Sequence, residues 1–555
     1  MSKLSKAVEE IKRREDAKKD LRLNEVVLNF MGGASYVINP IDTLKMITAS
    51  SIFGEPQYYR AGGLEWGSYY KVDEHVQAFS FLDKKFFYKT TSQIMTEAIN
   101  DALSYDFEQT LQWAVTLRRE YNIRLNPQVI MVRAALHEGR KKFTENNPSK
   151  FKEYNAKVML RADDTLSQIS YYLCLNNGEK NRIPSVLKRS WADALSKLDR
   201  YRVAKYKNHE IGLINAVRIC HAHSDVIDEL MRTGSVKTDK ADKTWENLRS
   251  EGKGWKEIFD TVDMGHMAIL RNIRGMFVEI DDYNFCKEVI DKLKSGVKGG
   301  KQLPFRYYSA RSAIGGHNCN HVGLIGDALE ECLDISMENF PQLKGRTMCL
   351  SDNSGSAWGG VATEFGYVTV AEIDNLSSTI TAARSDEGYV GKFGDGLITY
   401  PIQKRSGILE QTRKISGRRD RDVGGGTEGG IWIFFKNAIE KKEHWDNIFI
   451  YSDMQAGHGG LYGTDEQKIE YLKRGFGAGG YNEENINVFK LVNEYRDKVN
   501  PKVNVFTVQT AGYNNTLLPE FAYRTGILYG WTGKEVVFAD AMIKLWDDMD
   551  KRNGI

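Results

Sequence analysis

Apolar residues recur at helical spacing along the middle of the chain, from about residue 40 to about residue 340. Ile94, Ala98 and Ala102 repeat every four residues. These segments succeed one another with short polar connections and no strand-like blocks, which predicts stacked helix pairs, an α-solenoid. An irregular helical bundle remains an alternative, because no exact internal repeat is present. Further stripes of the same kind are formed by Phe107, Leu111, Ala114 and Val115; by Val129, Val132 and Leu136; by Leu213, Ala216, Val217 and Cys220; and by Ile269, Ile273 and Met276.

The pattern changes near residue 344, where short apolar segments begin to alternate with helical ones. Such alternation predicts a mostly parallel sheet with helices on both faces, in which ligands bind at the carboxyl ends of the strands. Two of the strands form a hairpin around Gly394-Asp395-Gly396. The expected strands are 347–350, 389–390, 397–400, 448–451 and 503–508, and the expected helices are 371–384, 407–417, 428–441 and 536–550.

Composition narrows the class of protein without naming it. A length of 555 residues allows two or three domains, and a net charge of +3 excludes a globally basic nucleic-acid binder. The six cysteines form no CxxC pair, so we expect neither a zinc site nor a disulfide framework, and a reducing compartment fits better. Residues 1–25 form a charged arm without the apolar core of a secretory signal. No apolar run is long enough to span a membrane. We therefore expect a cytoplasmic protein.

Three features converge on the carboxyl edge of the predicted sheet. The loop Asp352-Asn353-Ser354-Gly355-Ser356 directly follows the first strand and offers one carboxylate and two hydroxyls. Thr427 follows three glycines at the start of a helix, and Asp453 follows the strand 448–451. Oxygen ligands with few carboxylates suit a hard cation such as Mg²⁺, which commonly keeps an open or water-filled position. Each piece alone is more often a helix cap, but the three together predict a metal site.

Local basic clusters interrupt the near-neutral helical region. Between 182 and 207 there are eight lysines and arginines against Asp193 and Asp199, with Trp191, Tyr201 and Tyr206 among them. Basic side chains bind phosphates and exposed aromatic rings stack on unpaired bases, which favours RNA. A solvated helix face is the equally weighted alternative. A second cluster runs over Arg118, Arg119, Arg124, Arg133, Arg140, Lys141 and Lys142.

The following helix carries Arg218 and His221 three residues apart, on the side away from its apolar stripe. His223 cannot share that face with His221, so the pair is a poor metal site. A lone histidine is most often structural. Its position after a basic cluster makes an RNA contact equally plausible.

These motifs, in this order, resemble the Ro autoantigen family, whose helical part is the TROVE domain. The likeness is carried by Lys205-Tyr206-Lys207, by Ala216–His221, by the turn Gly54–Tyr59, by Ile269-Leu270-Arg271-Asn272-Ile273 and by Leu303-Pro304-Phe305. That family ends in a von Willebrand factor A-like domain, and the metal motif is its metal-ion-dependent adhesion site. One departure is the long glycine-rich insertion at 455–481, after Asp453.

The resemblance implies an architecture in three parts: the arm 1–25, a TROVE-type domain of HEAT-like repeats forming a ring over 26–343, and the A-like domain over 344–555. It implies that Mg²⁺ or another divalent ion is bound by Asp352, Ser354, Ser356, Thr427 and Asp453. RNA contacts are implied at Lys205, Arg218 and His221, with Lys207, His209 and Arg271 as further candidates.

The implied partners are small Y-type noncoding RNAs, the 3′ ends of misfolded RNAs, and an exoribonuclease such as polynucleotide phosphorylase. A monomeric ring acting as an RNA-binding scaffold, not an enzyme, is the resulting prediction. Two rivals stay open. One is a module that binds proteins through its metal. The other is a metal-dependent nuclease using Asp352 and Asp453.

Overall fold

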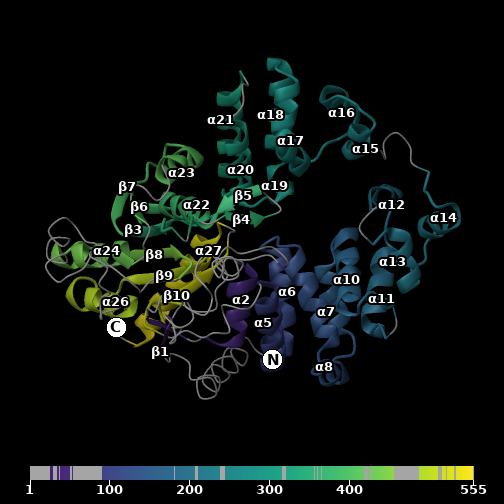
Figure 1. Ribbon diagram of the computed structural model, residues 1–555. Helices are drawn as coiled ribbons and strands as arrows, with labels where there is room; N and C mark the ends of the chain where they lie inside the picture. The colour runs from purple at the N-terminus through teal and green to yellow at the C-terminus, as the bar shows by residue number, and fades with distance from the viewer. Residues whose placement is uncertain are drawn as a thin grey trace, which may run out of the picture. The chain divides into compact units, whose positions relative to one another are not determined.

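The computed structural model divides the chain into two compact units (Figure 1). The helical unit comprises Met95–Gln302 and Ala310–Ser336, and the α/β unit comprises Met1–Ile94, Leu303–Ser309 and Met337–Ile555. Each unit is described by itself. The residues that the structure describes are 26–28, 34–36, 38–49, 53, 91–180, 182–206, 211–237, 244–315, 320–355, 357–358, 360–363, 366–417, 423–424, 428–454, 487–510, 516–519, 522–530 and 533–553.

The helical unit is a succession of short helices in which each packs mainly on its near neighbours in the chain. α6 contacts α7 and α9, α10 contacts α7 and α11, and α18 contacts α17 and α21. This pattern of local contacts is typical of stacked helical repeats. Among the described residues, no helix is long and apolar enough to cross a membrane. The helices are α5 (Thr91–Tyr105), α6 (Phe107–Arg119), α7 (Leu125–Leu136), α8 (Arg140–Asn146), α9 (Lys150–Val158), α10 (Ala162–Leu175), α11 (Ser185–Leu195), α12 (Arg200–Tyr206), α13 (Leu213–Cys220), α14 (Asp225–Thr233), α15 (Trp245–Ser250), α16 (Trp255–Thr261), α17 (His266–Glu279), α18 (Tyr283–Ser295), α19 (Val297–Gly300), α20 (Pro304–Gly315) and α21 (Val322–Ser336).

The predicted apolar stripes supply most of the core of this unit. Leu111, Ala114, Val129 and Val132 are fully buried. Leu136, at the end of its stripe, is 45% exposed. The start of α6 is fixed by Asp106, whose carboxylate accepts a hydrogen bond from the Gln109 backbone N–H at 2.8 Å. The helix succession predicted from apolar spacing is confirmed.

The α/β unit is built on a six-stranded sheet of order β10-β9-β8-β3-β6-β7. All neighbouring pairs are parallel except β6 and β7, which form an antiparallel hairpin. This confirms the predicted hairpin around 394–396. The strands are β3 (Leu343–Asp352), β6 (Ser385–Phe393), β7 (Leu397–Pro401), β8 (Asn447–Ser452), β9 (Asn504–Gln509) and β10 (Thr525–Tyr529).

Helices cover both faces of the sheet, because alternate strand residues point to opposite sides. Met348 and Leu350 pack with α24 (Glu428–Glu440) and α26 (Val488–Lys498). Cys349 packs with residues of α22 (Val370–Ala383), α23 (Ile408–Ser416) and α27 (Glu535–Asn553). The doubly wound arrangement predicted from the sequence is confirmed. The prediction overlooked α26, β10 and a small hairpin of β4 (Gly360–Thr363) and β5 (Gly366–Thr369).

A short N-terminal segment belongs to the α/β unit. It comprises the antiparallel pair β1 (Val26–Leu28) and β2 (Ala34–Tyr36) and the helix α2 (Pro40–Ala49). The Tyr36 N–H donates to the Thr516 carbonyl at 3.0 Å, and α2 contacts β10. The compact units are therefore discontinuous in the chain, whereas the predicted domains 26–343 and 344–555 are continuous. Local apolar patterning carries no information about such long-range packing.

Candidate functional site

Two of the predicted metal ligands, Asp352 and Asp453, lie at the carboxyl ends of adjacent parallel strands. β3 ends at Asp352, and Asp453 directly follows β8. The strands are paired up to Ser351 and Tyr451, which brings both carboxyl ends to the same edge. Both aspartates are fully buried. The topology thus explains why Asp352 and Asp453, which are 101 positions apart in the sequence, lie at the same edge of the sheet.

The Asp352 carboxylate is oriented by hydrogen bonds. The Ser452 hydroxyl donates to Oδ2 at 2.6 Å, and the Ser354 backbone N–H donates to Oδ1 at 2.9 Å. Burial raises the pKa of Asp352, and the hydrogen bonds from Ser452 and Ser354 partly oppose that rise. Ser354 is itself fully buried beside it. Ser356, Thr427 and the insertion 455–481 lie outside the described residues, so their parts in the site remain predictions.

A pair of hydrogen-bonded asparagine side chains anchors the loop after Asp352. Asn353 donates to Asn375 Oδ1 at 2.9 Å, and Asn375 donates back to Asn353 Oδ1 at 3.0 Å. The Ser351 hydroxyl also donates to Asn375 Oδ1, at 2.7 Å. All three residues are fully buried. This network fixes the loop to α22, which is a positioning role that the sequence motif did not reveal.

A third buried carboxylate, Asp374 on α22, was missed by sequence reasoning. It is fully buried. Burial raises the pKa of Asp374 well above its ordinary value and the charges of Asp352 and Asp453 raise it further, while hydrogen bonding with the Thr510 side chain opposes part of the rise. A signal for it existed. Residues 374–381 of this helix are rich in Asp, Asn, Ser and Thr where a helix against a sheet normally has apolar residues.

These groups fit a hard divalent cation. Buried carboxylates that repel one another are stabilised by a positive charge between them, and all of the donors are oxygen atoms. No three His, Cys, Asp or Glu side chains in the described part of the chain are close enough to hold a metal by themselves. An ion between Asp352 and Asp453 would therefore depend on hydroxyl ligands, which is the chemistry the DxSxS loop offers. The negative charge of Asp374 would attract that ion electrostatically.

The candidate RNA-binding residues that the structure describes lie on the helical unit. Arg218 and His221 are both exposed on α13 and at its end, while Ala216, Val217 and Cys220 of the same helix are buried. His221 caps the helix in the left-handed conformation, with φ of 56°. Their predicted placement away from the apolar stripe is confirmed. Lys207 and His209 lie outside the described residues.

Lys205 and Arg271 differ in their surroundings. Lys205, on α12, lies 3.7 Å from Glu246 and over the ring of Tyr201, at 6.0 Å from its centroid. Arg271 is exposed on α17 and forms no ion pair with the residues that the structure describes. Lys205 is thus partly committed to an intramolecular contact, whereas Arg218 and Arg271 present their charge to solvent.

Two expectations about the basic clusters are wrong. Trp191 is fully buried and donates to Gln168 Oε1 at 2.9 Å, so it is a core residue and not a stacking platform. Arg118 is also buried and pairs with Asp164 at 2.9 Å. Arg124 pairs with Asp163. Part of the second cluster is therefore structural, because these arginines hold α6 and the start of α7 against α10.

The fold is that of a helical-repeat array joined to a von Willebrand factor A-like α/β domain. It is similar to the crystal structure of the Ro (RSR) protein of Deinococcus radiodurans, with a TM-score of 0.52 and 14% sequence identity, over 81% of this chain and 93% of that chain. No protein-family model and no curated protein sequence matches the chain. The likeness confirms the Ro-type fold that the sequence motifs indicated.

Proposed function

We propose that this protein is an RNA-binding scaffold that binds small structured noncoding RNA through its helical unit. The observation that carries the proposal is the exposed Arg218–His221 face of α13, next in sequence to the basic helix α12, in a chain whose net charge is only +3. Such a local concentration of cations provides phosphate contacts. The Ro-type fold supports the same function.

The RNA is a Y-type noncoding RNA on the outer surface of the helical array, together with single-stranded 3′ ends of misfolded RNA. The protein stabilises noncoding RNA or controls its quality in the cytoplasm. It acts as a monomer that can dock an exoribonuclease such as polynucleotide phosphorylase. The α/β unit holds Mg²⁺ at Asp352, Ser354, Ser356, Thr427 and Asp453 and serves as a docking surface. Catalysis is not part of the proposal.

The test is a triple substitution of Lys205, Arg218 and His221 by alanine. Phosphate contacts release counterions, so the variant should bind a structured RNA more weakly at 0.1 M salt. Its plot of log affinity against log salt concentration should be shallower by about 0.9 for each phosphate that the variant no longer neutralises. Fluorescence anisotropy over a salt series measures both. Unchanged affinity and slope would refute the assignment of these residues.

A matched control removes the same kinds of side chain elsewhere on the helical unit. His223, Arg274 and Lys287 are exposed. Substituting all three by alanine changes the net charge by the same amount as the test variant. The control should retain most of the affinity. Equal losses in both variants would mean that net charge, and not this face, controls binding.

A second function is favoured by the buried carboxylates at the sheet edge. A metal with an open position could accept a carboxylate from a partner protein, making the α/β unit a protein-binding module. Pull-downs from lysate with nuclease and with EDTA distinguish the two functions. Partners lost with EDTA but kept after nuclease treatment support protein capture, while co-purifying RNA lost with nuclease supports the scaffold.

A further inference from the structure

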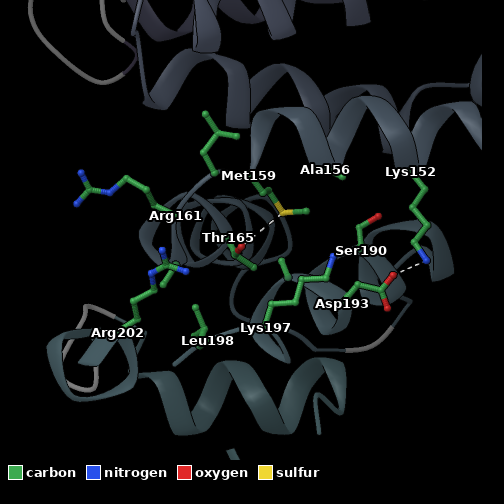
Figure 2. Close-up of a pocket in the computed structure, with 13 residues that line it drawn as sticks. Lys152, Ala156, Met159, Arg161, Thr165, Ser190, Asp193, Lys197, Leu198 and Arg202 are labelled. Carbon is green, nitrogen blue, oxygen red and sulfur yellow. Dashed lines mark hydrogen bonds and ion pairs between the residues drawn. The ribbon is translucent and has the colours of Figure 1, made fainter. Parts of the chain in front are cut away.

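Two adjoining pockets open on the surface of the helical unit, between α9, α10, α11 and α12. The first has a volume of about 250 Å³ and the second of about 290 Å³. They share Leu160, Arg161, Ala162 and Arg202, so they form one groove. In Figure 2 the two arginines lie at one end of the first pocket, and the Lys152–Asp193 ion pair lies at the other end.

The lining of the first pocket mixes apolar side chains with polar and charged ones. Met159, Leu160 and Leu198 line it, and the Thr165 hydroxyl contacts the Met159 sulfur at 3.5 Å. Its volume falls just below the range of about 300 to 1,000 Å³ that is typical of small-molecule sites. A flat fragment the size of one nucleobase suits such a pocket better than a whole nucleotide does.

The second pocket is lined by aromatic rings. Tyr201 is 38% exposed, and Tyr206 receives a hydrogen bond on its hydroxyl from the Arg161 guanidinium at 2.6 Å. Lys205, already a candidate RNA contact, lines the same pocket. Tyrosine faces and arginine planes are the surfaces on which unpaired bases stack in single-stranded RNA sites.

The lining of the groove holds more basic than acidic side chains, although Lys152 pairs with Asp193 and Lys205 lies 3.7 Å from Glu246. Five basic side chains line the two pockets, against one acidic side chain, Asp193. Arg202 is exposed and lies 3.6 Å from the exposed Asp199 carboxylate. An exposed ion pair of this kind is weak, so a phosphate could take the place of Asp199. Lys197 is exposed and forms no ion pair within the described part of the chain. Arg161 pairs with Asp163 at 3.1 Å, which fixes its guanidinium beside the junction of the pockets.

We propose that this groove binds two consecutive unpaired nucleotides of an RNA. One base enters the pocket lined by Met159 and Leu198, the next stacks in the pocket lined by Tyr201 and Tyr206, and the linking phosphate lies at Arg202. The inference rests on the proposed RNA-binding function and adds a defined site for unpaired nucleotides beside Lys205. An acidic peptide would satisfy the cations but would leave the apolar side chains of the first pocket and the tyrosine faces unused.

The experiment compares two fluorescein-labelled RNA hairpins, one with a 3′ tail of six uridines and one without a tail. Ala156 is exposed and lines the first pocket, so Ala156→Phe fills it, and Arg202→Ala removes the phosphate contact. The matched controls are Ala313→Phe and Arg232→Ala, which make the same changes at exposed positions outside the groove and outside the basic clusters.

Wild-type protein should bind the tailed hairpin more tightly than the blunt one. Each groove variant should weaken binding of the tailed hairpin roughly tenfold, because Ala156→Phe displaces a base and Arg202→Ala removes a phosphate contact, and should change binding of the blunt hairpin less than about twofold. Both controls should behave as wild type. A tail carrying 4-thiouridine should crosslink to peptides containing Met159 or Tyr201, and Ala156→Phe should abolish the Met159 crosslink.

The outcomes separate the two claims. If wild-type protein binds neither hairpin, the RNA-binding function fails and the groove assignment fails with it. If it binds both hairpins but the groove variants and crosslinks show no effect on the tail, only the groove assignment fails. A hexaglutamate peptide that displaces the tail as well as hexauridine does would assign the groove to acidic peptides and overturn the inference.

Discussion

Replacing Asp374 by asparagine should stabilise the protein without metal and weaken its response to Mg²⁺. The carboxylate is fully buried, the Thr510 side chain offsets only part of the pKa rise that burial causes, and the charges of Asp352 and Asp453 lie nearby. Asparagine has the same shape and no charge. Without a cation, the substitution therefore removes the repulsion between Asp374 and the other two aspartates. With a cation bound, it removes the attraction between Asp374 and that ion.

The size of the expected stabilisation follows from the raised pKa of Asp374. Burial is the largest cause of that rise, and the charges of the two other aspartates add to it. A carboxyl whose pKa is higher in the folded protein takes up a proton on folding. It imposes no penalty below its ordinary pKa of about 3.9, and the penalty grows as the pH rises above that value. At pH 7 the penalty is limited to about 4 kcal/mol, which is the free energy of protonating a group of pKa about 3.9.

Thermal unfolding measured in EDTA and in Mg²⁺, between pH 5 and pH 8, tests this reasoning. In EDTA the Asp374→Asn variant should melt several degrees higher than wild type at pH 7, because about 1 kcal/mol shifts the Tm of a domain of this size by roughly 2–4 °C. Its Tm should also fall less as the pH rises. Added Mg²⁺ should raise its Tm by less than it raises that of wild type.

The matched control is Ser378→Ala, one turn further along α22. The Ser378 hydroxyl is also buried without a hydrogen-bond partner within the described residues, but it carries no charge. The control should leave the Mg²⁺-induced shift and the pH dependence unchanged. A lower Tm for Asp374→Asn in EDTA, or an undiminished Mg²⁺ shift, would refute the electrostatic role of Asp374.

Three further substitutions test other parts of the molecule. Asp453→Asn should abolish the Mg²⁺-induced Tm shift, and calorimetric titration with Mg²⁺ should detect no binding; a normal isotherm would contradict the ligand assignment. Arg118→Leu leaves the buried Asp164 carboxylate without its cation, and urea unfolding should show a loss of about 3 kcal/mol or more. Gly388→Ala would place its Cβ 1.9 Å from the Ala382 carbonyl oxygen, and should cost more than about 2 kcal/mol; wild-type stability in urea would show that α22 shifts freely on the sheet.

Periodic segments were predicted well because their apolar residues face a single neighbouring layer. The stripe of α13 and the buried strand β8 are examples. α26 was not predicted although Val488, Leu491, Val492 and Tyr495 form a helical stripe, because this helix is short and directly follows a long glycine-rich segment. β10, Thr525–Tyr529, has only five residues at a sheet edge and little pattern of its own.

The candidate site was predictable where the residue types of one local motif indicate the kind of ligand, as in Asp352–Ser356. It was not predictable where burial decides the role. Trp191 and Arg118 have the composition of a binding surface, but tertiary packing places both in the core. Asp374 was missed although residues 374–381 are unusually polar for a helix on a sheet, since polar composition alone does not indicate which side chain faces the candidate site.

The packing of α2 on the α/β unit also constrains the order of folding. Ile41, Leu44 and Ile47 are buried on α2, yet its partner strand β10 begins only at Thr525, far along the chain from α2. The entropy of closing a loop grows with its length, so this contact is easier to form once the helical unit between the two ends has folded. A nascent chain therefore keeps this apolar helix without its strand partner until β10 has been synthesised, and any product that stops before residue 525 exposes the helix permanently, which marks such truncated chains for aggregation or for capture by chaperones.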